Sequence, residues 1–148
     1  LNRIIFPKLS FKYGESGDSS AVIQSTKKWA KYLLITMSCI ALGLTILIPI
    51  VFGQFFPKYI ASQFVCILIL WAGVLFSVNS IFQLAITSIK QHSYLHQQII
   101  FRFINFSICT ILIYPVMNVW LETVALAALI SEVFNLMHWM LILRRLQK

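Results

Sequence analysis

A carboxylate within an otherwise apolar stretch is the residue of this sequence with the clearest chemical potential. Glu132 lies near the middle of the run 121–143, and Asn135 follows about one helical turn later on nearly the same face. An ionised group at the centre of a bilayer costs roughly 2.5 to 3.5 kcal/mol on insertion scales and usually faces a bundle interior or a wet cavity. We therefore expect Glu132 to have a functional role, such as the exchange of a proton or a cation during transport.

Amide side chains recur in two other apolar runs. Asn79 and Gln83 are four residues apart and so share one helical face, and Asn105 lies in the next run. Together with Glu132 and Asn135, these amides are candidates for lining the path of a hydroxyl-rich or anionic cargo. The alternative is that the amides and the carboxylate of Glu132 only form hydrogen bonds between helices and fix their packing.

Patterns typical of catalysis or metal binding are missing from the sequence. The three cysteines lie in different apolar runs without neighbouring ligand residues, which is typical of small packing residues. His92 and His96 are four residues apart, but no glutamate completes a metalloprotease pattern, and we expect them to be solvated loop histidines. The sequence also contains no phosphate-binding loop and no nucleophile elbow. It therefore predicts neither an enzyme nor a metal or cofactor site.

Four apolar runs must position the polar groups, at residues 32–52, 62–89, 99–117 and 121–143. Each run is long enough to cross a hydrocarbon layer of ~30 Å, which takes about 20 helical residues. The composition, 59% hydrophobic and 11% charged, is more apolar than the ~45 to 50% of ordinary soluble domains. We expect an all-α, polytopic transmembrane helix bundle.

Aromatic residues near the ends of spans typically anchor a helix at the level of the lipid headgroups. Trp29, Trp120 and Trp139 have this placement. Trp71 lies inside the second run, where we expect it to pack against a neighbouring helix or lipid.

Basic residues concentrate on one side of the expected spans. Eleven of the twelve Lys and Arg residues precede the first span, lie around the second connection or follow the fourth span, and the exception is Lys58. Because basic residues resist translocation, this bias predicts that both ends of the chain and the loop containing Lys90 are cytoplasmic. The net charge of +8 then reflects topology and contact with anionic membrane lipids, and we expect no nucleic-acid partner.

The segments outside the spans are predominantly polar or basic. We expect residues 1–31 to hold the cytoplasmic end of a preceding helix, a polar loop and a short basic helix, and residues 144–148 to form a basic cytoplasmic tail. The sequence begins with Leu1 and has no secretory signal, so we expect an N-terminally truncated chain.

Two short motifs resemble those of a known transporter family. Residues 5–10 read IFPKLS, and residues 48–53 read IPIVFG, followed by Phe56 and Ala61. These motifs are similar to the second half of bacterial polysaccharide flippases, the polysaccharide transporter branch of the multidrug, oligosaccharidyl-lipid and polysaccharide exporter superfamily. The part from Pro49 to Gly53 is shorter than the family spacing by a single residue.

The resemblance implies a bundle of about twelve to fourteen helices in two halves that alternate between inward-facing and outward-facing states. Such a transporter flips oligosaccharide repeat units linked to undecaprenyl pyrophosphate across the bacterial inner membrane, for synthesis of O-antigen, capsule or exopolysaccharide. The chain would supply the last four helices and the end of the helix before them. Implied partners are the missing N-terminal half, membrane lipids, the lipid-linked oligosaccharide and the polysaccharide polymerase machinery.

Three basic residues are candidates for attracting the pyrophosphate at the cytoplasmic mouth: Lys31, Lys90 and Arg102. The alternative is that they only set the topology. Two other functions are alternatives to the flippase. One is a drug exporter of the same superfamily, and the other is a four-helix scaffold of polysaccharide synthesis that transports nothing.

Overall fold

The fold is an all-α helical bundle, seen in a computed structural model that describes residues 7, 8, 10, 11, 13, 14, 19–89, 92–117 and 119–146. Within this part of the chain the elements are α2 (Ser19–Phe55), the 3-10 helix η1 (Pro57–Ser62), α3 (Gln63–Ser88), α4 (His92–Met117) and α5 (Trp120–Leu146). Four helical stretches here are long and apolar enough to cross a membrane. The expected transmembrane helix bundle is confirmed at this level, and the chain is a multi-pass membrane protein.

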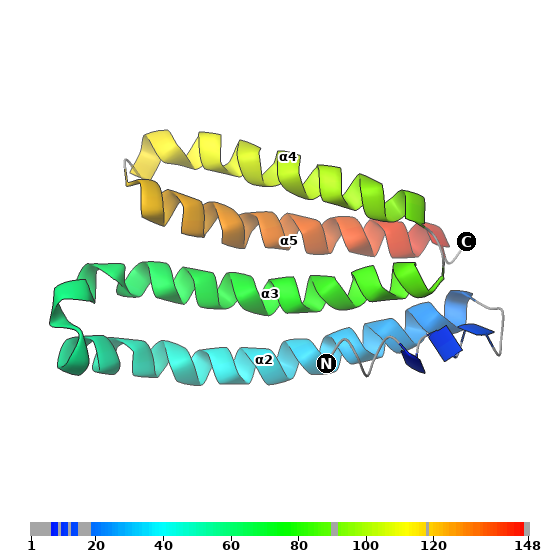
Figure 1. Ribbon diagram of the computed structural model, residues 1–148, viewed down its shortest axis with the longest axis horizontal. Coiled ribbons are helices and arrows are strands. Elements are labelled where there is room, and N and C mark those ends of the chain that lie inside the picture. The colour runs from blue at the N-terminus through cyan, green and yellow to red at the C-terminus, as the bar shows by residue number, and fades with distance from the viewer. Residues whose placement is uncertain are drawn as a thin grey trace.

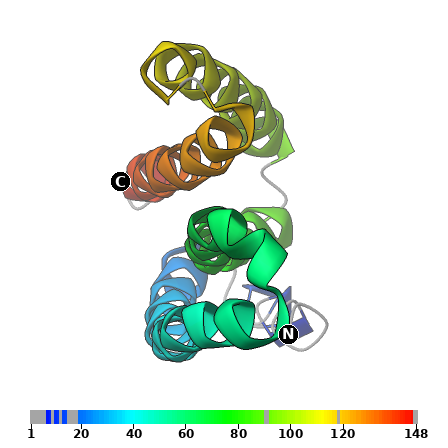
Figure 2. The ribbon, with the colours of Figure 1, turned by 90° about the vertical axis from the view of Figure 1, so that its left-hand side faces the viewer.

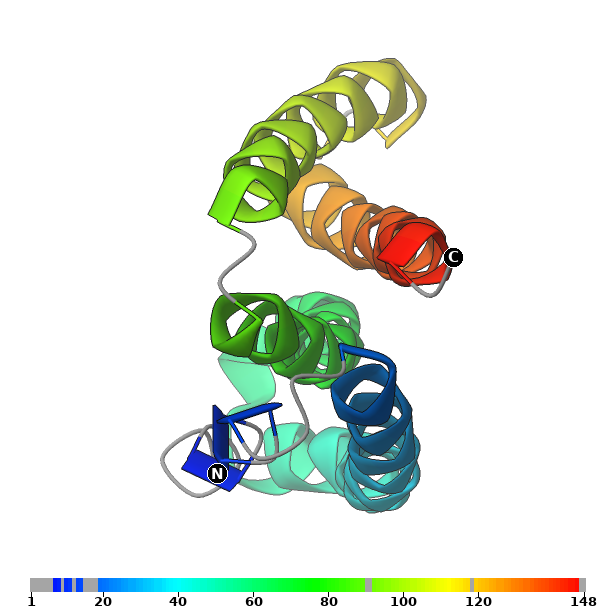
Figure 3. The ribbon, with the colours of Figure 1, turned by 90° about the vertical axis from the view of Figure 1, so that its right-hand side faces the viewer.

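The helices form two antiparallel hairpins that pack through their inner members. In Figure 1 the order across the molecule is α4, α5, α3 and α2, with η1 joining α2 to α3. Views from the two ends show the α2 and α3 pair on one side and the α4 and α5 pair on the other (Figure 2, Figure 3). Packing is extensive within each hairpin and between α3 and α5, whereas α3 and α4 touch only over a short region.

Helix α2 is longer than a membrane span. Its 37 residues extend for about 55 Å at ~1.5 Å per residue, well beyond a hydrocarbon layer of ~30 Å. The expected short basic helix before Tyr32 is therefore the first part of α2, continuous with the span. At its other end the helix runs through Gly53 and stops at Phe55, where Pro57 begins η1.

The main apolar core lies towards the end of the bundle where the basic residues of α2 and α5 gather. Ile23 of α2, Ile81 and Ile86 of α3, and Trp139 and Leu143 of α5 are buried together there. A smaller cluster joins α3 to α5 nearer the opposite end. This packing holds α3 against both α2 and α5. The polar side chains of α3 are therefore held in fixed positions between the helices.

The outer helices present apolar side chains to their surroundings. On α4, for example, Phe103, Ile111 and Leu112 are each about 70% exposed or more. Such a surface is stable against acyl chains, because lipid tails are as apolar as these side chains.

Helix α4 begins earlier than the apolar pattern predicts. It starts at His92 instead of near Ile99, because the polar residues before the apolar run continue the helix. His96 is therefore an exposed helical residue, and the expectation of loop histidines is wrong. Arg102 consequently lies near the middle of α4. The expected helix end and loop within 1–18, apart from six residues, lie outside the described residues, as do Lys90 and the last two residues of the tail.

The topology predicts that Lys28 and Lys58 lie on opposite sides of the membrane, because the apolar part of α2 separates them. In a chain without its three native cysteines, Lys28→Cys and Lys58→Cys should react with a membrane-impermeant maleimide from opposite sides. Arg145→Cys is the control and should label from the same side as Lys28→Cys. Labelling of all three from one side would contradict this arrangement.

Candidate functional site

A hydrogen-bonded contact between α3 and α5 lies at the centre of the bundle. The side-chain nitrogen Nδ2 of Asn79 donates to Oε2 of Glu132 at 2.7 Å and to the backbone oxygen of Glu132 at 3.1 Å. Both residues are buried. Asn79 thus supplies hydrogen bonds to a carboxylate that is shielded from water.

Arg102 of α4 completes this centre. Its Nη2 donates to Oε1 of Glu132 in an ion pair. The guanidinium carbon also lies 4.6 Å from the centroid of the Phe76 ring on α3, within the range of a cation–π interaction. Arg102 therefore links α4 to both α5 and α3.

The two members of the ion pair differ in their exposure. Both lie near the middle of their helices, but the Glu132 side chain is 9% exposed and the Arg102 side chain is 37% exposed. Removal of Arg102 would leave a buried carboxylate without a counter-charge, a change that typically costs about 3 to 5 kcal/mol. We expect the pair to fix the register of α4 against α5.

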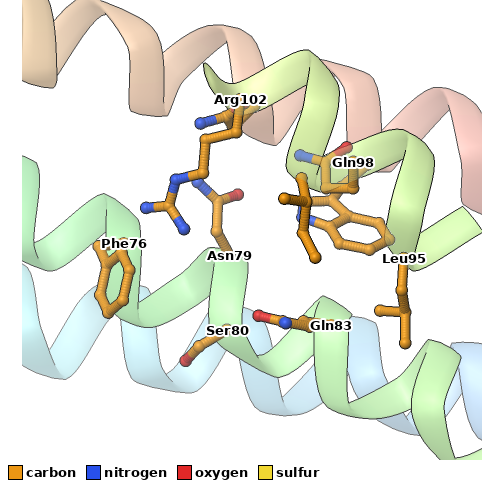
Figure 4. Close-up of a pocket in the computed structure, with 10 residues that line it drawn as sticks. Phe76, Asn79, Ser80, Gln83, Leu95, Gln98 and Arg102 are labelled. Atoms are coloured by element: carbon orange, nitrogen blue, oxygen red, sulfur yellow. The ribbon is translucent and has the colours of Figure 1, made fainter. Parts of the chain in front are cut away.

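A cavity of about 50 Å³ lies beside the ion pair, between α3 and α4 and against α5. We call it the α3–α4 cleft. Figure 4 shows Arg102 reaching from α4 towards Phe76 and Asn79 of α3, with Gln83 and Gln98 further along the cleft. The lining consists of five uncharged polar side chains, one cation and four apolar or aromatic side chains: Asn79, Ser80, Gln83, Gln98 and Asn135, then Arg102, then Phe76, Leu95, Ile99 and Trp139.

One side chain against the cleft has no hydrogen-bond partner at all. Asn135 is 1% exposed, and both its Nδ2 and its Oδ1 are unpartnered. The Oδ1 of Asn79 is also buried without a partner. A buried polar group in this condition usually costs about 1 to 3 kcal/mol.

An open groove lies on the other side of the ion pair, along α4 and α5. Its volume is about 480 Å³, and its walls include Phe103, Phe106 and Ala128. Ile99 and Arg102 line both this groove and the α3–α4 cleft. A mostly apolar groove and a polar cleft thus adjoin each other at Arg102.

The structure brings together most of the candidate residues. The cleft is lined by Asn79, Gln83 and Asn135. Beside it, Glu132 accepts a hydrogen bond from Asn79. Asn105 lies apart, where its Nδ2 donates to the backbone oxygen of Ser131 at 3.3 Å between α4 and α5.

The basic candidates have different positions. Arg102 is a partner of Glu132 in the interior, not a residue of the cytoplasmic mouth. Lys31 is exposed on α2 and does not line the cleft, and Lys90 lies outside the described residues.

Sequence analysis did not single out Gln98 or Phe76, and it misplaced Trp139. Gln98 lines the cleft and contacts Nδ1 of His138 through Oε1, and Phe76 lies under Arg102. Gln98 and Arg102 are four residues apart, a spacing that places both on one helical face. The sequence-based boundary near Ile99 left Gln98 outside the predicted helix, so this relation was not recognised. Trp139 is only 2% exposed, so its expected role as an interfacial anchor is wrong.

The geometry suits binding of a polar group within a membrane. Among the described residues no group of three or more His, Cys, Asp or Glu side chains is placed to hold a metal ion.

Comparison with known proteins gives no match. No protein-family model, no curated protein and no solved structure matches this chain.

The ion pair predicts strong coupling between two substitutions. Arg102→Leu leaves the buried carboxylate of Glu132 unpaired and should lower the free energy of unfolding by about 3 to 5 kcal/mol, whereas Glu132→Leu leaves the partly exposed Arg102 unpaired and should cost less. The double variant should lose much less than the sum, because no unpaired charge then remains. Unfolding of the purified chain in mixed micelles measures all three values, and additive losses would contradict the pair.

Asn79 should contribute more to stability than its neighbour on the same helix face. Asn79→Leu removes both hydrogen bonds to Glu132 and should destabilise the bundle by about 1 to 3 kcal/mol. Gln83→Leu is the matched control one turn away, and because Gln83 is exposed, its effect should stay within about 0.5 kcal/mol. The same unfolding assay tests both, and equal effects would argue against the central role of Asn79.

Proposed function

We propose that this chain forms part of a transporter that flips oligosaccharide repeat units linked to undecaprenyl pyrophosphate across the bacterial inner membrane. The observation that supports this function best is the meeting of a polar cleft and an apolar groove at Arg102. A lipid-linked oligosaccharide likewise combines a polar part with an apolar part, since a hydroxyl-rich head is joined to a long apolar tail.

The polar cleft suits the sugar part of the cargo. Its amides and one hydroxyl offer both donors and acceptors, which match sugar hydroxyls. The positive charge of Arg102 is neutralised by Glu132, so the cleft favours uncharged groups over the pyrophosphate. The amide-rich lining also favours a sugar transporter over a drug exporter.

The apolar groove suits the lipid part. It is open to the side of the bundle, and aromatic and aliphatic side chains of α4 and α5 form most of its walls. A lipid tail can remain in the hydrocarbon layer along such a groove while one substituent of a sugar in the head group reaches into the adjoining cleft.

The packing of the helices supports movement by alternating access. Because α3 and α4 touch only over a short region, α4 can change its angle to α3 at a smaller packing cost than α5, whose packing against α3 is extensive. Breaking the contact of Arg102 with Phe76 would remove one of the side-chain contacts between α4 and α3. In this proposal the ends of the bundle that are rich in basic residues face the cytoplasm. A further half of the transporter closes the central cavity and places the transporter beside the polysaccharide polymerase machinery.

A complementation experiment tests this function. A complete transporter gene that carries this segment should restore surface polysaccharide in a flippase-deletion strain, and its Glu132→Gln variant should not, because Arg102 then lacks its counter-charge. Glu122→Gln is the matched control, since Glu122 lies in the first turn of α5 and outside the cleft, and it should restore polysaccharide fully.

The amount of each protein in the membrane must be equal in this assay. Equal rescue by both glutamine variants would show that Glu132 is dispensable. If the parent gene fails in hosts with compatible sugar repeats, the flippase function is wrong.

A further inference from the structure

The unpartnered amide of Asn135 is difficult to explain as a packing residue. Its side chain is almost completely buried, yet neither its donor nor its acceptor makes a hydrogen bond. A leucine has a similar size and would fill the same space without the cost of a buried, unsatisfied amide. Asn135 also lines the cleft, with its amide atoms covered in the present conformation.

The chemistry of this amide defines its complement. A carboxamide presents a donor, Nδ2, and an acceptor, Oδ1, side by side in one plane. Another amide matches both at once, because its N–H donates to Oδ1 while its carbonyl oxygen accepts from Nδ2. The unpartnered Oδ1 of Asn79 is a further acceptor close by in the lining.

Charge and size narrow the choice of ligand. The only described cation of the lining, Arg102, is already paired with Glu132, which disfavours an anion and a second cation alike. The cavity of about 50 Å³ has room for a small substituent, not for a whole sugar ring. Leu95, Ile99 and Trp139 add apolar surface, which suits a methyl group.

We propose that the α3–α4 cleft binds the acetamido group of an N-acetylated sugar, with Asn135 paired to its amide and the apolar side chains against its methyl group. The proposal rests on the function above and names the class of sugar that this site selects. The amide atoms of Asn135 are covered in the present conformation. The acetamido group therefore enters when α4 moves away from α3, which its limited contact with α3 permits.

Saturation-transfer NMR on the complete transporter in lipid nanodiscs tests the proposal. The two probes are methyl N-acetylglucosaminide and methyl glucoside, which share the ring and differ in the acetamido group. The acetamido methyl protons should receive saturation from the protein, and methyl glucoside should give a several-fold weaker signal. Asn135→Leu should abolish this difference, whereas the control Asn105→Leu should keep it, because Asn105 lies outside the cleft.

Thermal unfolding of the same variants gives a second readout. Asn135→Leu should melt at a higher temperature than the parent, because the variant removes an unsatisfied buried amide. A lower melting temperature would overturn the proposal, since it would show that Asn135 has partners within the fold. Equal signals from the two sugars, or unchanged binding by Asn135→Leu, would overturn it as well.

The outcome is separable from that of the proposed function. If the parent gene restores surface polysaccharide but the protein does not distinguish the two sugars, the acetamido site is wrong and the flippase function stands. If the parent gene restores no polysaccharide, the flippase function itself fails.

Discussion

The pairing of Arg102 with Glu132 is the interaction on which the arrangement of the inner helices depends. Each charge lies near the middle of a membrane-spanning helix, and the buried carboxylate of Glu132 has the guanidinium of Arg102 as its counter-charge. Asn79 extends the same constraint to α3 through its two hydrogen bonds to Glu132. One polar centre therefore joins three helices, in addition to the apolar packing that holds α3 between α2 and α5.

The cleft is a consequence of unequal packing around that centre. Apolar residues hold α3 firmly between α2 and α5, but the packing of α4 against α3 is limited. Arg102 contacts the Phe76 ring across this gap. Amides fill the resulting space incompletely, and Asn135 is left unpartnered. The free-energy cost of this buried, unpartnered amide is better explained by binding of a ligand, as proposed above, than by packing of the helices.

Sequence periodicity predicted the parts of the site that lie on a single helix. Apolar runs gave the all-α class and the four spans, and a spacing of four residues placed Asn79 and Gln83 on one face. The ion pair was missed because the polar residues from His92 onward were assigned to a loop, which moved Arg102 towards the end of its helix. The burial of Trp139 depends on how α5 meets α2 and α3, and no spacing within one helix contains that information.

The protonation state of Glu132 tests the central claim most directly. Infrared difference spectra between the parent chain and Glu132→Gln, both in lipid bilayers near neutral pH, isolate the signal of this side chain. An ion pair with Arg102 predicts that the parent shows carboxylate stretching bands that the variant lacks. The carbonyl band of a protonated carboxylic acid would contradict the ion pair and, with it, the account of how α3, α4 and α5 are held together.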